Sequence, residues 1–241
     1  MRLLVYNIRY GTGGKRLWFP WSGYLRVTSD NLRNIIRFIA SLDPDIAGLI
    51  EVDDGSYRSE RTSQAQSIAH ALGHFHTYRS KYSVTSFANH LPILNKQGNA
   101  FLTKDSIHNE KFHYFDKGMK RLVIELELSN LTVYLVHLAL SYRVRHQQLE
   151  RLHSLIKGNT KPHIVAGDFN ALSGSREMNL FMAATNLINA NAGEQASFPS
   201  WAPKRQLDFV LHSPGIQPRK FWLPRVTYSD HLPLVLDFDV E

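Results

Sequence analysis

Residues 163–171, HIVAGDFNA, place a carboxylate and a carboxamide directly after a short apolar run. The apolar residues 164–166 predict a buried strand, and Gly167 permits a close approach at its end. In an extended chain, side chains two positions apart face the same side, so Asp168 and Asn170 can act together while Phe169 packs. Their oxygens are ligands that hard divalent cations such as Mg²⁺ prefer, and a carboxylate can also take a proton from water. The stretch therefore predicts half of a site for metal-assisted or acid–base chemistry.

Polar residues also stand at the ends of the other predicted strands. They are Asn7, Glu51, His137, Asp208 and the run Ser229-Asp230-His231. Functional groups gather at the strand ends of open α/β sheets because the loops leave the rigid scaffold there. We therefore expect these side chains to converge on one site, whose carboxylates and amides suit a divalent cation and a phosphate.

Each of these residues also has a purely structural interpretation. Glu51 could be a buried ion-pair partner, and Asp168 with Asn170 could form an Asx-turn that leaves the strand. A histidine in an apolar strand, such as His137, is more often a core residue whose hydrogen bonds are satisfied. The joint pattern, rather than any single residue, favours the functional interpretation.

Alternating strands and helices must position these residues. Strands are expected at residues 3–8, 45–52, 99–104, 121–128, 131–140, 163–169, 206–212 and 233–240, and helices at 28–44, 62–73, 142–157 and 176–186. The helix at 28–44 has its apolar residues on one face, which is typical of an amphipathic helix. Because a tight turn joins strands 121–128 and 131–140, the class is α/β with mixed sheets rather than one all-parallel sheet.

Composition limits the class of protein further. The 241 residues contain no repeat and no long linker, so we expect a single domain over residues 1–241. No cysteine is present, which excludes disulfides, a thiolate nucleophile and cysteine-based zinc sites. No apolar stretch is long enough to span a membrane and the N-terminus lacks the pattern of a signal peptide, so a cytoplasmic protein is expected.

The charge balance of the chain is basic. Lys and Arg total 28 against 21 Asp and Glu, a formal net charge of +7. Such an excess favours polyanionic partners such as nucleic acid, phosphorylated substrates or anionic lipid, the alternative being a solvated basic surface. Basic segments lie at residues 9–26, 117–121, 142–146 and 203–206.

The first of these basic segments also contains an aromatic cluster. Its members are Trp18, Phe19, Trp21 and Tyr24. A cluster of this kind suits stacking on bases, shallow insertion at a membrane interface, or packing over a sheet edge.

Seven short segments, taken in order, carry a family resemblance. They are YNIRYG, LIEVD, GNAFL, VHLAL, GDFNA, QLDFVL and SDHLPL, from Asn7 to Leu234. The series resembles the motifs of the endonuclease/exonuclease/phosphatase superfamily, which includes deoxyribonuclease I-like nucleases, apurinic endonucleases, inositol-polyphosphate 5-phosphatases and neutral sphingomyelinases. The resemblance implies a four-layer α/β/β/α sandwich of two mixed β-sheets flanked by helices, with the active site at one end of the packed sheets. Ile50 departs from the pattern, because relatives commonly have glutamine before the glutamate.

The resemblance also implies a metal site and a water-activating group. Glu51 would hold Mg²⁺, for which Mn²⁺ is a possible substitute, with Asn7 beside it and Asp230 as a further ligand. Asp168 would orient or deprotonate the attacking water, and Asn170 would hydrogen-bond a phosphate oxygen.

Two histidines and three further residues complete the implied site. His231 would contact the phosphate or transfer a proton, oriented by Asp208 or supported by Asp230. His137 would be the second histidine, donating to a non-bridging oxygen or assisting the leaving group. The implied substrate-binding residues are Arg9, which would contact phosphate, and Asn99 and Arg121, which occupy places where relatives have substrate- or site-supporting residues.

The expected function is hydrolysis of a phosphoester that depends on a divalent metal. The leading hypothesis is a nuclease or phosphodiesterase acting on nucleic acid by attack of water on phosphorus. The alternatives are a phosphatase or phospholipase-like hydrolase of a small phosphoester or phospholipid headgroup, and a non-catalytic binding module on the same scaffold. No obligate protein partner is evident.

Overall fold

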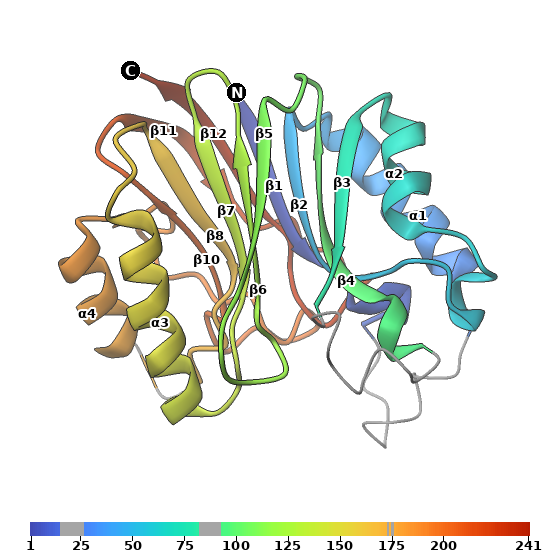
Figure 1. Cartoon of the computed structure of the whole chain (residues 1–241). Coiled ribbons are helices and arrows are strands. Elements are labelled where there is room, and N and C mark those ends of the chain that lie inside the picture. The colour runs from blue at the N-terminus through green and yellow to red at the C-terminus, as the bar shows by residue number, and fades with distance from the viewer. Residues whose placement is uncertain (15–26, 82–92, 173, 175) are drawn as a thin grey trace.

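Two six-stranded mixed sheets pack face to face, and helices cover their outer faces (Figure 1). This is the computed structural model of the chain, and it describes residues 1–14, 27–81, 93–172, 174 and 176–241. The four-layer α/β/β/α arrangement expected from the sequence is confirmed.

The first sheet draws its strands from distant parts of the chain. In the order β11-β12-β1-β2-β4-β3 it joins β1 (Arg2–Asn7), β2 (Ile46–Asp53), β3 (Phe75–Ser80), β4 (Gln97–Thr103), β11 (Ile216–Trp222) and β12 (Leu234–Val240). Strand β1 is parallel to β2 and antiparallel to β12. Two neighbouring strands inside this sheet, β1 and β12, therefore come from opposite ends of the described chain.

The second sheet is continuous in sequence. In the order β5-β6-β7-β8-β10-β9 it joins β5 (Asn109–Tyr114), β6 (Leu122–Glu127), β7 (Thr132–His137), β8 (His163–Asp168), β9 (Ile188–Asn189) and β10 (Asp208–His212). Strands β7 and β8 are parallel, and the other pairs are antiparallel. Each sheet thus has one parallel pair, whose polar strand ends lie at the same edge.

Two helices cover each outer face (Figure 1). Helices α1 (Ser29–Leu42) and α2 (Gln64–Leu72) lie against the first sheet, and α3 (Tyr142–Ile156) and α4 (Arg176–Thr185) lie against the second. Short 3₁₀ helices η1 (Arg9–Gly11), η2 (Tyr57–Ser59) and η4 (Leu94–Lys96) lie in the connections. No helix in the described ranges is both long and apolar enough to cross a membrane.

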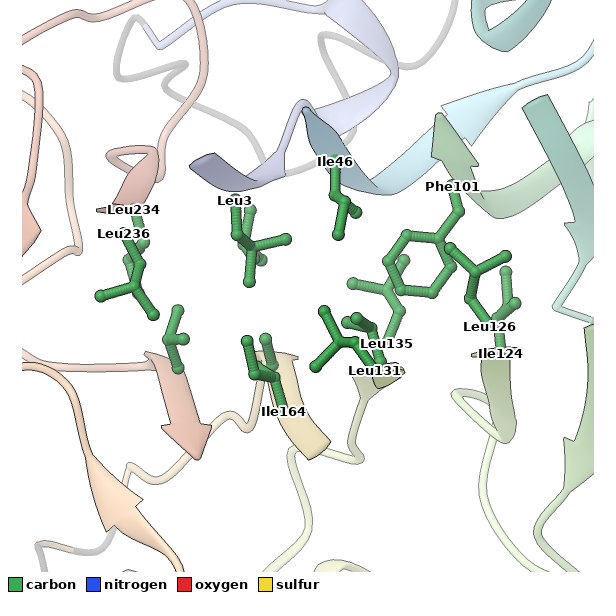
Figure 2. Close-up of a cluster of buried hydrophobic side chains, with 14 of the residues drawn as sticks. Leu3, Ile46, Phe101, Ile124, Leu126, Leu131, Leu135, Ile164, Leu234 and Leu236 are labelled. Carbon is green, nitrogen blue, oxygen red and sulfur yellow. The ribbon is translucent and has the colours of Figure 1, made fainter. Parts of the chain in front are cut away.

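The apolar runs of the central strands are explained by burial on both faces. In β1, Leu3 and Val5 point into the core between the sheets, whereas Leu4 and Tyr6 point toward the helices. Figure 2 shows the inter-sheet core, where side chains of both sheets meet. A strand buried on both faces has no polar alternation, and these strands therefore read as continuous apolar runs.

The structure differs from the sequence-based expectation at three places. The strand expected at residues 131–140 ends at His137, because residues 138–140 leave the sheet and bond to β8 and α3. Glu51 lies inside β2 rather than at its end. Strands β3, β5, β9 and β11 were not predicted at all.

Candidate active site

A cavity of about 380 Å³ opens where the polar strand ends of the two sheets meet. Seven residues singled out from the sequence line it: Asn7, Arg9, Glu51, Asp168, Asn170, Asp230 and His231. They come from both sheets, and they lie at the end of the sandwich opposite to the N- and C-terminal ends of the chain (Figure 1). The polar ends of these strands therefore lie together around one cavity.

A β-bulge presents Glu51 to the cavity. Leu49 pairs with Ala100 and Val52 with Gly98, so Ile50 and Glu51 together face Asn99. The φ angle of Glu51 is 55°, in the left-handed region. The Asn99 side-chain oxygen accepts a hydrogen bond from the Glu51 backbone N–H at 3.3 Å.

This bulge gives Asn99 a supporting place rather than one in the cavity. Asn99 is 2% exposed and does not line the cavity. It supports the bulged backbone of Glu51 from behind, which is how a strained backbone conformation is maintained.

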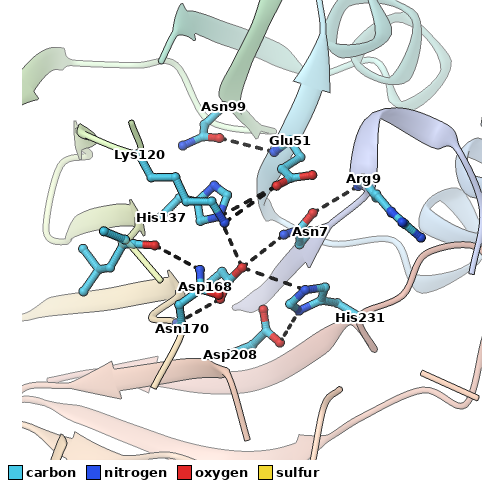
Figure 3. A network of polar contacts seen from close by, with 12 residues as sticks. Asn7, Arg9, Glu51, Asn99, Lys120, His137, Asp168, Asn170, Asp208 and His231 are labelled. Carbon is cyan, nitrogen blue, oxygen red and sulfur yellow. Dashed lines mark hydrogen bonds and ion pairs between the residues drawn. The ribbon is translucent and has the colours of Figure 1, made fainter. Parts of the chain in front are cut away.

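Asn7 connects the two sheets across the floor of the site (Figure 3). Its amide nitrogen Nδ2 donates to Asp168 Oδ2 at 3.2 Å, and its oxygen Oδ1 accepts from the Arg9 backbone N–H at 3.0 Å. Arg9 lines the cavity as expected, with its Nε 3.4 Å from Asp230 Oδ2.

The end of β8 shows why the sequence HIVAGDFNA is built as it is. Gly167 has a φ of 143°, and a Cβ there would lie 2.0 Å from the Val136 carbonyl oxygen of the neighbouring strand. Asp168 Oδ1 accepts from the Asn170 backbone N–H at 3.0 Å, so the Asx-turn considered above is present. Asn170 Nδ2 donates to Leu138 O at 3.0 Å, and Phe169 is fully buried in the core under α4. Asp168 and Asn170 therefore form the Asx-turn and also line the cavity.

His231 forms a hydrogen-bonded pair with Asp208 (Figure 3). Its Nδ1 lies 2.8 Å from Asp208 Oδ2, and Ser197 Oγ donates to the same carboxylate oxygen at 2.6 Å. Burial alone would lower the pKa of His231, but the carboxylates of Asp208, Asp168 and Asp230 raise it to about 10. The imidazolium thus keeps an N–H on Nε2, which lies 3.9 Å from Asp168 Oδ2.

Asp168 is a buried carboxylate that remains ionised. Burial would raise its pKa, but the charge of His231 and the close contact of the His137 imidazole, whose Nε2 lies 3.3 Å from Asp168 Oδ2, hold the pKa well below its usual range. It is 1% exposed. A carboxylate in this state accepts hydrogen bonds strongly and orients whatever donor enters the cavity.

His137 lies on the other side of Asp168. Its Nε2 is 3.3 Å from Asp168 Oδ2 and 3.8 Å from Glu51 Oε1. Burial, together with the nearby Lys120 ammonium, lowers the pKa of this imidazole. Within the described part of the chain, Nε2 meets no well-directed acceptor, so its contact with Asp168 is a weak one.

Lys120 is a site residue that the sequence-based prediction missed. It lines the cavity, with its Nζ 3.9 Å from Glu51 Oε1, whereas the predicted neighbour Arg121 does not line it. The basic segment 117–121 was recognised, but nothing in it distinguished the two residues. Adjacent side chains that lead into a strand point to opposite sides, so only one of the pair can face the site.

The donor set fits a hard divalent cation. Burial would raise the pKa of Glu51, but Lys120, His137 and Lys81 lower it, so the carboxylate is charged. Among the described residues no hydrogen bond ends on its oxygens, and Asn7 and Asp230 add oxygen ligands nearby.

A second group of potential ligands lies beside this one. Asp168, Asp208 and His231 bring ligand atoms within 4.8 Å of one another. The Nδ1 proton of His231 already bonds to Asp208, and it would have to leave before that nitrogen could bind a metal. Glu51, in contrast, has carboxylate oxygens on which no hydrogen bond among the described residues ends.

The aromatic cluster of residues 18–24 lies outside the described residues, and so does most of the basic segment 9–26.

Solved structures of similar fold come from several organisms. The human Nocturnin catalytic domain with bound sulfate anion is 24% identical, with 100% of this chain and 93% of that chain covered and a TM-score of 0.68. A mannosyl-6-phosphatase of Bacteroides thetaiotaomicron is 14% identical, with 99% of each chain covered and a TM-score of 0.72. An AP endonuclease from Archaeoglobus fulgidus is 13% identical, with 100% of each chain covered and a TM-score of 0.68.

No curated protein matches the chain. The family model described as the Endonuclease/Exonuclease/phosphatase family matches residues 4–231, and that span contains all of the cavity-lining groups described above. The chain belongs to the Endonuclease/Exonuclease/phosphatase family.

Proposed function

We propose that the chain is a divalent-metal-dependent phosphoester hydrolase of the nuclease or phosphodiesterase type, with nucleic acid as its substrate. The observation that carries this proposal is the placement of the Asp168 carboxylate between His137 and His231, whose Nε2 atoms lie 3.3 Å and 3.9 Å from its Oδ2, beside the cavity that Glu51 lines with a carboxylate suited to a cation. Hydrolysis at phosphorus needs an oriented water and positive groups beside the phosphate oxygens, and these residues provide both.

In this proposal Asp168 orients the attacking water and accepts its hydrogen bond. Its low pKa makes it a weak base, so orientation is the larger part of its role. The Nε2–H of protonated His231 donates to a phosphate oxygen as negative charge develops there, and Asp208 keeps the ring oriented. Asn170 adds a neutral donor to the phosphate, because its Nδ2 has a second hydrogen besides the one bonded to Leu138 O.

His137 and the metal site complete the proposed arrangement. His137, whose pKa is lowered and whose contact with Asp168 is weak, turns to a non-bridging oxygen or the leaving group when substrate is bound. Glu51, Asn7 and Asp230 would hold Mg²⁺ or Mn²⁺, which supplies positive charge to the phosphate and to the leaving oxygen when it is bound.

Two observations support nucleic acid as the substrate. The chain has a formal net charge of +7, and three cationic side chains, Arg9, Arg58 and Lys120, line the cavity. A polyanion is attracted by such a surface, whereas an uncharged headgroup gains nothing from it. Family members are named for both nucleases and phosphatases, and a small phosphoester that fits the cavity of about 380 Å³ is therefore the second candidate.

The decisive experiment is a hydrolysis screen of the purified protein with Mg²⁺ or Mn²⁺, with and without chelator. The substrates are plasmid DNA, single-stranded DNA, RNA, abasic DNA, a generic phosphodiester, sugar phosphates and phospholipids. We expect cleavage of nucleic acid that is lost with chelator and in the Asp168→Asn variant, which also excludes a contaminating nuclease. Cleavage confined to sugar phosphates or lipids would establish the second candidate instead, and no hydrolysis at all would favour a binding module.

A further inference from the structure

Lys120 places an ammonium group in the cavity with no hydrogen bond to hold it there. Its Nζ lies 3.9 Å from Glu51 Oε1, which is too far for a hydrogen bond, and its side chain is 21% exposed. No other residue in the described ranges bonds to this ammonium. The other two cations that line the cavity have closer partners, because Arg9 Nε lies 3.4 Å from Asp230 Oδ2 and Arg58 Nη2 lies 2.8 Å from Asp53 Oδ2. Lys120 therefore offers donors to whatever enters.

A buried glutamine of α3 fixes the segment that carries Lys120. Gln148 is 2% exposed, and its Nε2 donates to Lys117 O at 3.0 Å and to Lys120 O at 2.7 Å. Its Oε1 accepts from the Ala139 backbone N–H at 2.8 Å. One side chain thus uses both amide hydrogens on one loop and its oxygen on another.

The second loop, residues 138–140, is itself bonded to the site residues. The Leu138 N–H donates to Asp168 O at 2.9 Å, and Asn170 donates to Leu138 O. Arg145, also buried in α3, donates to Ala139 O at 3.0 Å and to Leu140 O at 2.9 Å. Gln148 therefore ties the Lys120 segment to the loop that holds Asp168 and Asn170 in place.

We propose that Lys120 binds a non-bridging oxygen of the substrate phosphate, and that Gln148 is the positioning residue that keeps it at that place. The inference rests on the proposed function only in that the ligand is a phosphate. Lys120 precedes β6 of the second sheet, whereas Arg9 follows β1 of the first, so the cavity receives cations from both sheets. The competing role for Lys120 is that of a counter-ion that only neutralises Glu51.

The phosphate-binding role proposed for Lys120 can be tested without any turnover, by measuring the binding of inorganic phosphate in the presence of Mn²⁺. We expect Lys120→Met to weaken phosphate binding by calorimetry about 10-fold or more, the size of a lost charge-assisted hydrogen bond. Binding of Mn²⁺ itself, measured separately, should be unchanged or tighter. The control is Lys117→Met, an exposed lysine of the same segment, which should leave both affinities unchanged.

Unchanged phosphate affinity in Lys120→Met would overturn the proposal. In that case tighter Mn²⁺ binding would identify the residue as a counter-ion of Glu51. A wild-type protein that hydrolyses none of the screened substrates would refute the proposed function, whereas the phosphate titration would still decide the role of Lys120.

A double-mutant cycle tests the positioning role proposed for Gln148. Gln148→Leu should weaken phosphate binding in the wild-type background and add little in the Lys120→Met background, because its effect passes through Lys120. With any substrate that the screen identifies, KM should rise more than kcat falls. The matched control is Gln147→Leu, the exposed neighbour on α3.

Two results would refute the role of Gln148. One is a loss of stability with full phosphate affinity, and the other is a loss of affinity that persists undiminished without Lys120.

Should Gln148→Leu not fold, Gly118→Ala takes its place. A Cβ at Gly118 would lie 3.0 Å from Gln148 Nε2 and would displace the same segment. The same two criteria then apply to it.

Discussion

The pKa values of the two histidines on either side of Asp168 are shifted in opposite directions, and the reason is local. His231 is surrounded by Asp208, Asp168 and Asp230, which outweigh the effect of burial on its pKa. His137 is buried as deeply but lies near the Lys120 ammonium, and its pKa is lowered. A histidine with a raised pKa and one with a lowered pKa therefore contact the same carboxylate, which suits a reaction that moves charge across a phosphate.

The first prediction concerns Asp168 and His231. Asp168→Asn and His231→Ala should each lower kcat more than about a hundredfold, the size of one proton-transfer or oriented-charge contribution. Both variants should keep the far-ultraviolet circular dichroism of the wild type. Near-normal turnover by either purified variant would contradict the assignment of the site.

The second prediction concerns Ser197, which is fully buried behind Asp208. Its hydroxyl donates to Asp208 Oδ2 and accepts from the backbone N–H groups of Leu207 and Asp208, each at 3.2 Å. Ser197→Ala leaves these groups unsatisfied and should lower the free energy of unfolding by about 1–3 kcal/mol. It should also lower kcat several-fold with KM unchanged, and Ser197→Thr should restore kcat. A changed KM with full kcat would be the opposite of what this contact predicts.

The sequence revealed the site residues that follow apolar strands, and it did not reveal those that act across the fold. Asp168 and Glu51 could be found because a polar group stands next to a continuous apolar run. Ser197 and Gln148 act on residues far from them in the chain, and no local pattern marks such contacts. The role of Lys120 depends on the path of one loop, which Gln148 determines.

At the scale of elements, the four strands that were not predicted from the sequence are the edge strands of the two sheets. All eight interior strands were predicted, and β3, β5, β9 and β11 were not. Edge strands are paired on one side and partly exposed, so they lack the apolar run that identifies a buried strand. In β5 the first three residues are exposed, and β11 contains Pro218 at a register shift.

The third prediction concerns the β7–β8 pair. Gly167→Ala would bring a Cβ to 2.0 Å from the Val136 carbonyl oxygen at a φ of 143°, so the parallel strands must separate. The free energy of unfolding, from urea denaturation, should fall by more than about 3 kcal/mol. Gly158→Ala is the control, since no atom lies within 4 Å of its added Cβ. Equal stability of the two variants would refute the explanation given for Gly167.

The fourth prediction is a pH dependence at the β1–β12 pair. Arg2 Nε and Nη2 donate to Asp237 at 2.7 Å and 3.0 Å, and these bonds lower the pKa of Asp237. A carboxyl whose pKa is lower in the folded state stabilises the fold above its unfolded pKa of about 4, and this is lost as the pH falls through the folded value.

Asp237→Asn should therefore be less stable than the wild type at pH 7, and the difference should shrink toward about pH 3. Urea denaturation at several pH values measures it. The control is Asp239→Asn, whose partner Arg219 is exposed on the same pair of strands. A difference that stays constant with pH would mean that the ion pair is not its cause.

At the scale of the whole molecule, the site exists only where the two sheets meet. Asn7 and Glu51 belong to the first sheet, and Asp168 and Asp208 belong to the second. The Asn7–Asp168 and His231–Asp208 hydrogen bonds both cross between the sheets. Any change that shifts one sheet against the other therefore disturbs the cavity as well as the core.

The fifth prediction follows from the net charge of +7. If nucleic acid is the substrate, the affinity for an oligonucleotide, measured with Ca²⁺ in place of Mg²⁺, should fall steeply with salt. A linear decrease of log affinity with log salt reports the counterions released by each neutralised phosphate. A mononucleotide serves as the control and should show a much shallower slope. Equal slopes would favour the small-phosphoester alternative.

The pairing of β1 with β12 has a consequence for protein synthesis. The register joins Val5 to Leu234, so β1 leaves the ribosome long before its antiparallel partner is made. Until then one edge of an apolar strand is open to wrong pairing, and the closure of so long a loop makes the final pairing slow. His231 directly precedes β12 and reaches its place with that strand. A growing chain thus has no complete set of site residues, and the cavity becomes competent only when the first sheet closes.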